Sequence, residues 1–319
     1  GSGRSQLSFE AIAKATEEAT VPNISDRQTG EVFEQIRVAP RLDEYRSDWD
    51  YRPVREFDVT NDREFYDAGG WAEGRIPVWG GEGFNIWEPE TGEVKAWADR
   101  AIAVKEIQRK RRRQIRDSRS AFLGQPPAWA EDETTLPYQR PRIAFRGISQ
   151  RTNERTVIAA MIPGQVFLQN SAPYFFRRAG SARSDAWLLA FLSSIPLDWY
   201  ARTLIETNLN FFIINGFPIP PLHDGALMDE RIIAIAGRLA AFDERFRDWA
   251  DELGVEVGTA NSEATKSDLI AELDALVALL YGLTREQLEH VFASFQRGWD
   301  YSTRLAAVFE HYDRWKGAQ

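Results

Sequence analysis

The sequence predicts an α+β protein in which a segment of mixed strands and helices is followed by an all-helical C-terminal region. Between Arg37 and Leu222, short runs of β-branched and aromatic residues are separated by Gly, Pro and Asn, as in strand-rich segments. Residues 98–120 contain neither Gly nor Pro, which favours one uninterrupted helix. After Leu222, apolar residues recur every three or four positions, the period of amphipathic helices.

These patterns divide the chain into three expected regions. Residues 1–36 read as a connector, and Gly1-Ser2-Gly3 at its start resembles a remnant of expression cloning, so we expect the chain to be part of a longer polypeptide. Residues 37–222 form the mixed domain, and residues 223–319 form the helical C-terminal domain. A length of 319 residues is consistent with two domains or with one large domain and an appendage.

The expected strands are short and lie within the mixed domain. They are Arg75–Trp79, Phe84–Trp87, Arg142–Ile148, Thr156–Ile162 and Gln165–Leu168. Between two aromatic runs, residues 89–93 (Pro-Glu-Thr-Gly-Glu) predict a hairpin turn.

The expected helices are marked by caps and apolar stripes. Residues 98–120 predict a helix with an Arg-rich exposed face, and Ser184-Asp185 predicts the cap of a helix that starts at Ala186 and ends or kinks near Pro196. Gly282 fits a helix end, and residues 284–287 (Thr-Arg-Glu-Gln) fit the start of the next helix. The apolar stripes that should face the core are Ile232, Ile235, Leu239, Phe242, Phe246 and Trp249, then Leu269, Leu273, Leu276 and Leu280.

The net charge of −9 is unevenly distributed. Residues 101–156 hold 13 basic and 6 acidic side chains, a local excess of seven positive charges, while the acidic excess lies at 10–67 and 243–289. A basic patch of this kind steers polyanions such as nucleic acids, although a solvated basic helix without a partner has the same composition. Charge alone therefore leaves both interpretations open.

Several classes of chemistry lack their residues. The chain has no Cys, and His223, His290 and His311 show no metal-ligand spacing, so we expect no metal site. Neither a glycine-rich phosphate-binding motif nor the Asn/Asp-Pro-Pro-aromatic motif of amine methylation is present, so we expect no catalytic residues and no cofactor in this chain. The longest apolar run, 186–195, is too short to cross a bilayer, which predicts a cytoplasmic protein.

Nine segments, in the same order along almost the whole chain, resemble the C-terminal half of type IIG and BREX-like adenine-specific DNA methyltransferases, a restriction–modification family. These segments are 49–65, 75–83 (RIPVWGGEG), 141–148 (PRIAFRGI), 152–160 (TNERTVIAA), 162–163 (IP), 207–212 (TNLNFF), 217–221 (FPIPP), 272–276 (ELDAL) and 280–286 (LYGLTRE). Two features depart from the family pattern: Phe84-Asn85 replaces the usual Lys after Glu82-Gly83, and 131–133 adds an acidic insertion.

The resemblance implies that residues 37–222 are a DNA target-recognition domain, with double-stranded DNA as the partner. It also implies an upstream methyltransferase domain that binds S-adenosylmethionine and methylates adenine. Basic side chains would contact phosphates, and amide side chains would read base edges in the major groove. The expected phosphate contacts are Arg109, Lys110, Arg111, Arg112, Arg113, Arg142, Arg146, Arg151 and Arg155. The expected base readers are Asn153, Thr207, Asn208 and Asn210, although Asn208 and Asn210 would also suit turn caps.

Two alternative functions have their own residues. A Trp-rich surface around Trp71, Trp79, Trp87 and Trp97 would suit a protein-interaction module of a phage-defence complex. Glu93 and Lys95 match the E-x-K pattern of metal-dependent nucleases, in which carboxylates hold magnesium and Lys assists the attacking water. Such tripeptides are common by chance, and this one coincides with the expected hairpin turn.

Overall fold

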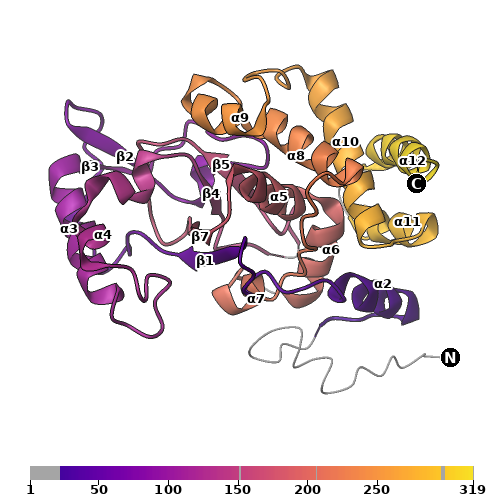
Figure 1. Cartoon of the computed structure of the whole chain (residues 1–319), viewed down its shortest axis with the longest axis horizontal. Helices are drawn as coiled ribbons and strands as arrows, with labels where there is room; N and C mark the ends of the chain where they lie inside the picture. The colour runs from indigo at the N-terminus through magenta and orange to yellow at the C-terminus, as the bar shows by residue number, and fades with distance from the viewer. Residues whose placement is uncertain (1–21, 151, 206, 296–298, 319) are drawn as a thin grey trace. The chain divides into compact units, whose positions relative to one another are not determined.

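The computed structural model describes residues 22–150, 152–205, 207–295 and 299–318, and it confirms the α+β class (Figure 1). The chain forms two compact units. Unit 1 comprises residues 1–50, 149–158 and 179–319, and unit 2 comprises residues 51–148 and 159–178. This division differs from the one expected from sequence, because the chain crosses between the units four times instead of passing through domains in order.

Unit 2 is built on two small sheets. The first has the strand order β1-β7-β4-β5, in which β4 pairs antiparallel with β5 and β7. The second has the order β3-β2-β6, with β2 antiparallel to β3 and parallel to β6. The strands are β1 (Asp50–Val54), β2 (Arg75–Trp79), β3 (Ala96–Asp99), β4 (Arg142–Phe145), β5 (Ala159–Ile162), β6 (Phe167–Leu168) and β7 (Tyr174–Ala179).

The main helix of unit 2 is α3 (Arg100–Gln114), whose N-terminus is capped by the Asp99 carboxylate accepting from the Ile102 backbone N–H at 3.0 Å. Its apolar residues pack with Phe57 and Phe167 in the core beside the second sheet. The opposite side of α3 is exposed and basic. The remaining helices of unit 2 are α4 (Pro127–Glu131) and the 3₁₀ turns η1 (Arg63–Phe65), η2 (Gly81–Gly83), η3 (Glu133–Thr135) and η4 (Pro137–Gln139).

All the secondary-structure elements that the structure describes wholly within unit 1 are helices. The helices are α2 (Arg27–Arg37), α5 (Ala182–Ser193), α6 (Ile195–Leu204), α7 (Phe211–Asn215), α8 (Leu227–Ala240), η5 (Glu244–Phe246), α9 (Arg247–Leu253), α10 (Glu263–Leu280), α11 (Arg285–Ala293) and α12 (Ser302–Lys316). Figure 1 shows α12 beside α10, the most extensive helix–helix contact of this unit. No described helix is long and apolar enough to cross a membrane.

Two buried carboxylates organise the centre of unit 1. Asp198 accepts hydrogen bonds from the backbone N–H groups of Thr156 and Val157 and pairs with the buried Arg155. Asp274 of α10 accepts from the backbone N–H of Ile195 at 2.8 Å and pairs with Arg304 of α12. Because a buried charge is costly unless it is paired, these contacts hold residues 155–157 against the first turn of α6 and tie the start of α6 and α12 to α10.

The structure confirms several predicted elements and corrects others. Strand Arg75–Trp79 and the Thr284 capping box with Gln287 match the prediction, and Gly282 follows α10 with φ +69°. The predicted strand Phe84–Trp87 is a turn closed by the Asn85–Glu88 bridge, and residues 89–93 lie in a long connection from β2 to β3 and do not form a tight hairpin turn.

Other boundaries shift by one turn or more. Helix α5 begins at Ala182, because Ser181 and Ser184 form its capping box, so Ser184 is the third helical residue and not the cap. As predicted, that helix ends near Pro196, at Ser193, and Pro196 lies in the first turn of α6, where its missing N–H costs no hydrogen bond. The helix predicted over 98–120 ends at Gln114, and Phe242 lies beyond α8 with 44% of its side chain exposed, so it leaves the predicted apolar stripe.

Candidate nucleic-acid interface

Several exposed basic residues of unit 2 lie on α3 and in the turn after it. Arg109 pairs with Glu106 and Arg112 pairs with Glu131, so part of their charge is matched. Arg113 and Arg116 are also exposed, and in the described part of the chain neither side chain has an ion-pair or hydrogen-bond partner. Arg109 and Arg113 lie one helical turn apart on α3, and Arg116 lies in the turn that follows the helix. We call these three residues the basic stripe.

Arg111, predicted to contact phosphate, lies inside unit 2 with 1% of its surface exposed. Its guanidinium donates to the Thr135 hydroxyl and carbonyl and lies 3.8 Å from the centroid of the Trp129 ring. Burial lowers the pKa of this guanidinium. In this structure a DNA phosphate cannot reach Arg111, which therefore holds the α3–α4 packing together.

Arg142 is also buried, although a phosphate contact was predicted for it. It pairs with Glu56 at 3.3 Å and donates to the Val166 carbonyl at 2.8 Å, with Tyr174 beneath it. Burial is the largest influence on both members of the pair, raising the pKa of Glu56 and lowering that of Arg142. Arg142 thus links the segment after β1, which carries Glu56, to the segment before β6, which carries Val166.

The other predicted phosphate contacts include residues with structural partners and residues that are exposed. Arg155 is buried against Asp198, and Lys110 is tied to Asp62 and to the Glu56 carbonyl, so both have structural partners. Arg146 is half-buried and donates to the Phe84 carbonyl. Arg151 lies outside the described residues. Of the nine predicted phosphate contacts, Arg109, Arg112 and Arg113 remain largely exposed.

Three of the predicted base readers lie on two exposed segments of unit 1. The Ser149 backbone N–H donates to the Thr207 carbonyl at 3.3 Å, which places the loop 149–154 beside residues 207–208. Asn153, Thr207 and Asn208 are all exposed there. We call this pair of segments the amide loops. Asn208 makes one described side-chain contact, a 3.3 Å hydrogen bond to the Thr207 hydroxyl, so its amide is free to take another partner.

Asn210, the fourth predicted base reader, occupies the N-cap position of α7. Its backbone carbonyl accepts from the Ile213 and Ile214 N–H groups, and its half-buried side chain makes no capping hydrogen bond. Its position at a helix start is therefore fixed by the backbone.

Arg202 of α6 lies beneath the amide loops and was not singled out from the sequence. It donates to the carbonyls of Asn153 and Glu154 and, at 3.0 Å, to the Thr156 hydroxyl. These bonds fix the loop that carries Asn153. The available signal was the spacing of Trp199, Arg202 and Thr203, which puts three polar or aromatic side chains on one face of a helix.

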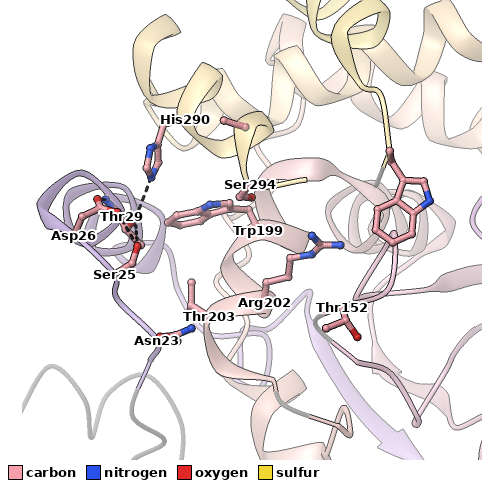
Figure 2. Close-up of a pocket in the computed structure, with 12 residues that line it drawn as sticks. Asn23, Ser25, Asp26, Thr29, Thr152, Trp199, Arg202, Thr203, His290 and Ser294 are labelled. Carbon is pink, nitrogen blue, oxygen red and sulfur yellow. Dashed lines mark hydrogen bonds between the residues drawn. The ribbon is translucent and has the colours of Figure 1, made fainter. Parts of the chain in front are cut away.

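Arg202 also borders a cavity of about 680 Å³ in unit 1, shown in Figure 2. The walls come from the segment before α2, from α2 itself, from α6 and from α11. The lining residues are Asn23, Ser25, Asp26, Thr29, Thr152, Trp199, Arg202, Thr203, His290, Ala293, Ser294 and Trp299. His290 Nε2 lies 3.1 Å from the Thr29 hydroxyl, the contact drawn as a dashed line in Figure 2.

The residues of the two alternative functions do not assemble as predicted. Trp79 and Trp87 are buried and Trp97 is half-buried, so of the four Trp residues only Trp71 is largely exposed, at 76%. Lys95 pairs with Glu82 at 3.1 Å, and no cluster of three or more potential metal ligands occurs among the described residues. A Trp-rich docking surface is therefore not formed in unit 2.

No protein-family model matches the chain, and no curated protein matches it. Among solved structures, the chain is similar to one described as the Type IIL restriction-modification enzyme MmeI in complex with DNA. The identity is 12%, the TM-score is 0.40, and the match covers 77% of this chain and 35% of that chain. This chain thus spans about a third of the length of the protein it matches.

Proposed function

We propose that this chain is the sequence-specific DNA recognition module of an adenine-N6 DNA methyltransferase in a restriction or phage-defence enzyme. The catalytic domain, with its S-adenosylmethionine, would lie upstream in the same polypeptide. The observation that carries the proposal is the basic stripe, whose Arg113 and Arg116 are exposed and lack counter-charges among the described residues.

Unpaired surface cations are informative because this protein is acidic overall, at −9. Other exposed arginines, such as Arg245 and Arg247, pair with neighbouring carboxylates. Two free guanidinium groups on one stripe can release condensed counterions from a nucleic-acid backbone, which is the main source of sequence-independent affinity. They fix the position of the protein on the duplex without reading bases.

The amide loops supply the second requirement, a means to read sequence. An Asn side chain presents one acceptor and two donors and can pair in bidentate fashion with adenine in the major groove. Asn153 and Asn208 have exposed side chains on adjoining loops, and Arg202 holds the first of these loops in place. A recognition surface already held by hydrogen bonds within the protein loses less entropy when it binds.

The test is duplex DNA binding by the variant Arg113→Gln/Arg116→Gln, compared with the variant Arg245→Gln/Arg247→Gln. Both variants change the net charge by the same amount, but the second removes arginines that already have carboxylate partners. We expect the stripe variant to lose about tenfold or more in affinity for every sequence at low salt, and the control to change little. Equal losses in the two variants would show that only overall charge matters, and would contradict the assignment.

The proposal also assigns methyl transfer to the upstream domain. Calorimetric titration of this chain with S-adenosylmethionine should give no saturable heat. Saturable binding with a stoichiometry near one would show that the cofactor site is here.

A further inference from the structure

The cavity of Figure 2 has the size and lining of a ligand site. Its volume of about 680 Å³ lies within the range of small-molecule pockets, roughly 300–1,000 Å³. Such pockets combine aromatic walls with a few polar groups that orient the ligand. Here the half-buried Trp299 provides aromatic surface, and Thr203, Ser294 and His290 provide polar groups, while Trp199 lies in the wall with 3% of its surface exposed.

Arg202 gives the cavity its charge preference. Its guanidinium lies 4.0 Å from the centroid of the Phe295 ring and donates to one hydroxyl and two carbonyls, all of them neutral. In the described ranges no carboxylate lies within ion-pair distance of it, because Asp198 is taken by Arg155. Burial is the main reason the pKa of Arg202 is lowered, while the nearby Asp198 carboxylate acts in the opposite direction. A half-buried cation with only neutral partners favours an anionic ligand.

The acidic group of the cavity indicates where that anion would lie. Asp26 belongs to α2, where its carboxylate accepts from the Thr29 backbone N–H at 2.8 Å, and this bond is the main reason its pKa is lowered. In Figure 2 Asp26 and Arg202 lie on opposite sides of Trp199. A negative ligand group would therefore be repelled at the α2 side and attracted at the α6 side.

We propose that this cavity binds one nucleotide unit, with its phosphate at Arg202 and its base against the indole ring of Trp299. Stacking on aromatic side chains accepts any base, while a guanidinium selects the phosphate. The source of the nucleotide rests on the proposed function: Thr152 lines the cavity and also belongs to the amide loops, so a strand held by those loops could place one unpaired nucleotide there. A free mononucleotide has the same chemistry.

The test measures binding of three probes to the full chain: inorganic phosphate, deoxyadenosine monophosphate and a four-nucleotide single strand. The variant Ala293→Trp fills the cavity from its exposed rim, and Ala306→Trp makes the same change at an exposed helical position of α12 that does not line the cavity. We expect saturable binding of the mononucleotide, weakened at least tenfold by Ala293→Trp and unchanged by Ala306→Trp. Tighter binding of the single strand than of the mononucleotide identifies a strand as the source, and equal affinities identify a free nucleotide.

Two results would overturn this proposal. One is inorganic phosphate binding as tightly as the mononucleotide, which would leave a plain anion site. The other is mononucleotide binding that Ala293→Trp leaves unchanged. Failure here is distinguishable from failure of the DNA-recognition proposal, because duplex binding through the basic stripe does not require the cavity. A chain that binds duplex but no nucleotide contradicts only the cavity, and a chain that binds nucleotide but no duplex contradicts only the recognition module.

Discussion

Arginine has two physically different roles in residues 101–156, and burial separates them. Arg111, Arg142 and Arg155 are buried inside a unit, where their guanidinium groups contact Thr135, Glu56 and Asp198 respectively. Arg113 and Arg116 face solvent. The first group should affect stability when it is changed, and the second should affect ligand binding.

Arg111→Gln tests this separation directly against Arg113→Gln. Removing the buried guanidinium leaves the Thr135 carbonyl without its donor and opens space beside Trp129, which should cost about 2–4 kcal/mol. Arg113→Gln should change the free energy of unfolding by less than about 0.5 kcal/mol, because surface substitutions usually do. Urea unfolding followed by circular dichroism measures both. Similar stability of the two variants would contradict the assignment of Arg111 to the core.

Asn208→Ala tests base reading at a single residue. If its exposed amide pairs with one base, the variant should lose about 1–3 kcal/mol of binding free energy for the preferred duplex and little for random DNA. Selection from a random duplex library, followed by competition titrations, gives both values. Asn210→Ala is the informative comparison, because Asn210 is half-buried at the start of α7 and should affect sequence preference less. Unchanged site preference for Asn208→Ala would leave it as a turn residue.

The distinction between the two groups of arginines could be made only partly from the sequence. The run Arg109–Arg113 is uniformly basic, but the spacing of Val104, Ile107 and Ile115 places Arg111 on their helical face. Arg111 is buried because Trp129 and Thr135 return to it through the loop after α3. Arg142 is buried because Glu56 lies beside it, 86 residues earlier in the chain. Tertiary partners of this kind leave no local pattern.

At the scale of elements, the helices with strong caps were predictable and the short strands only partly. The Thr284–Gln287 box and Gly282 are local signals, and both mark real helix ends. At Ser181–Ser184 two serines compete for the cap, and the structure uses the earlier one. Phe84–Trp87 has the composition of a strand but forms a turn, because a buried aromatic run fits either when tertiary packing decides.

Helix α10 provides a graded test of core packing. Leu276 is fully buried and Leu280 is half-buried, although both belong to the predicted stripe. Leu276→Ala should cost about 2–5 kcal/mol of unfolding free energy, and Leu280→Ala clearly less, because the cost grows with the cavity left behind. Denaturant unfolding measures the difference. Neither variant should alter which DNA sequence is preferred, and equal costs for the two would contradict the packing of α10.

At the scale of the whole molecule, the protein keeps a net charge of −9 while presenting free cations on one stripe of unit 2. An acidic protein repels DNA at long range, so its binding must depend on local contacts. At low salt, the long-range repulsion and the local attraction between protein and DNA both act over a greater distance. The counterions released from the DNA then determine the net binding affinity. The sequence predicted the local excess of charge, but the structure reduces the number of cations that can reach a phosphate.

The dependence of duplex DNA binding on salt concentration tests the central claim most directly. The logarithm of the association constant should fall linearly with the logarithm of salt concentration, with a slope of about −0.9 for each phosphate contacted. The variant Arg113→Gln/Arg116→Gln should flatten that slope by about 2, since it removes two contacts. A slope near zero, or a slope that the variant leaves unchanged, would contradict the claim that this chain recognises DNA through its basic stripe.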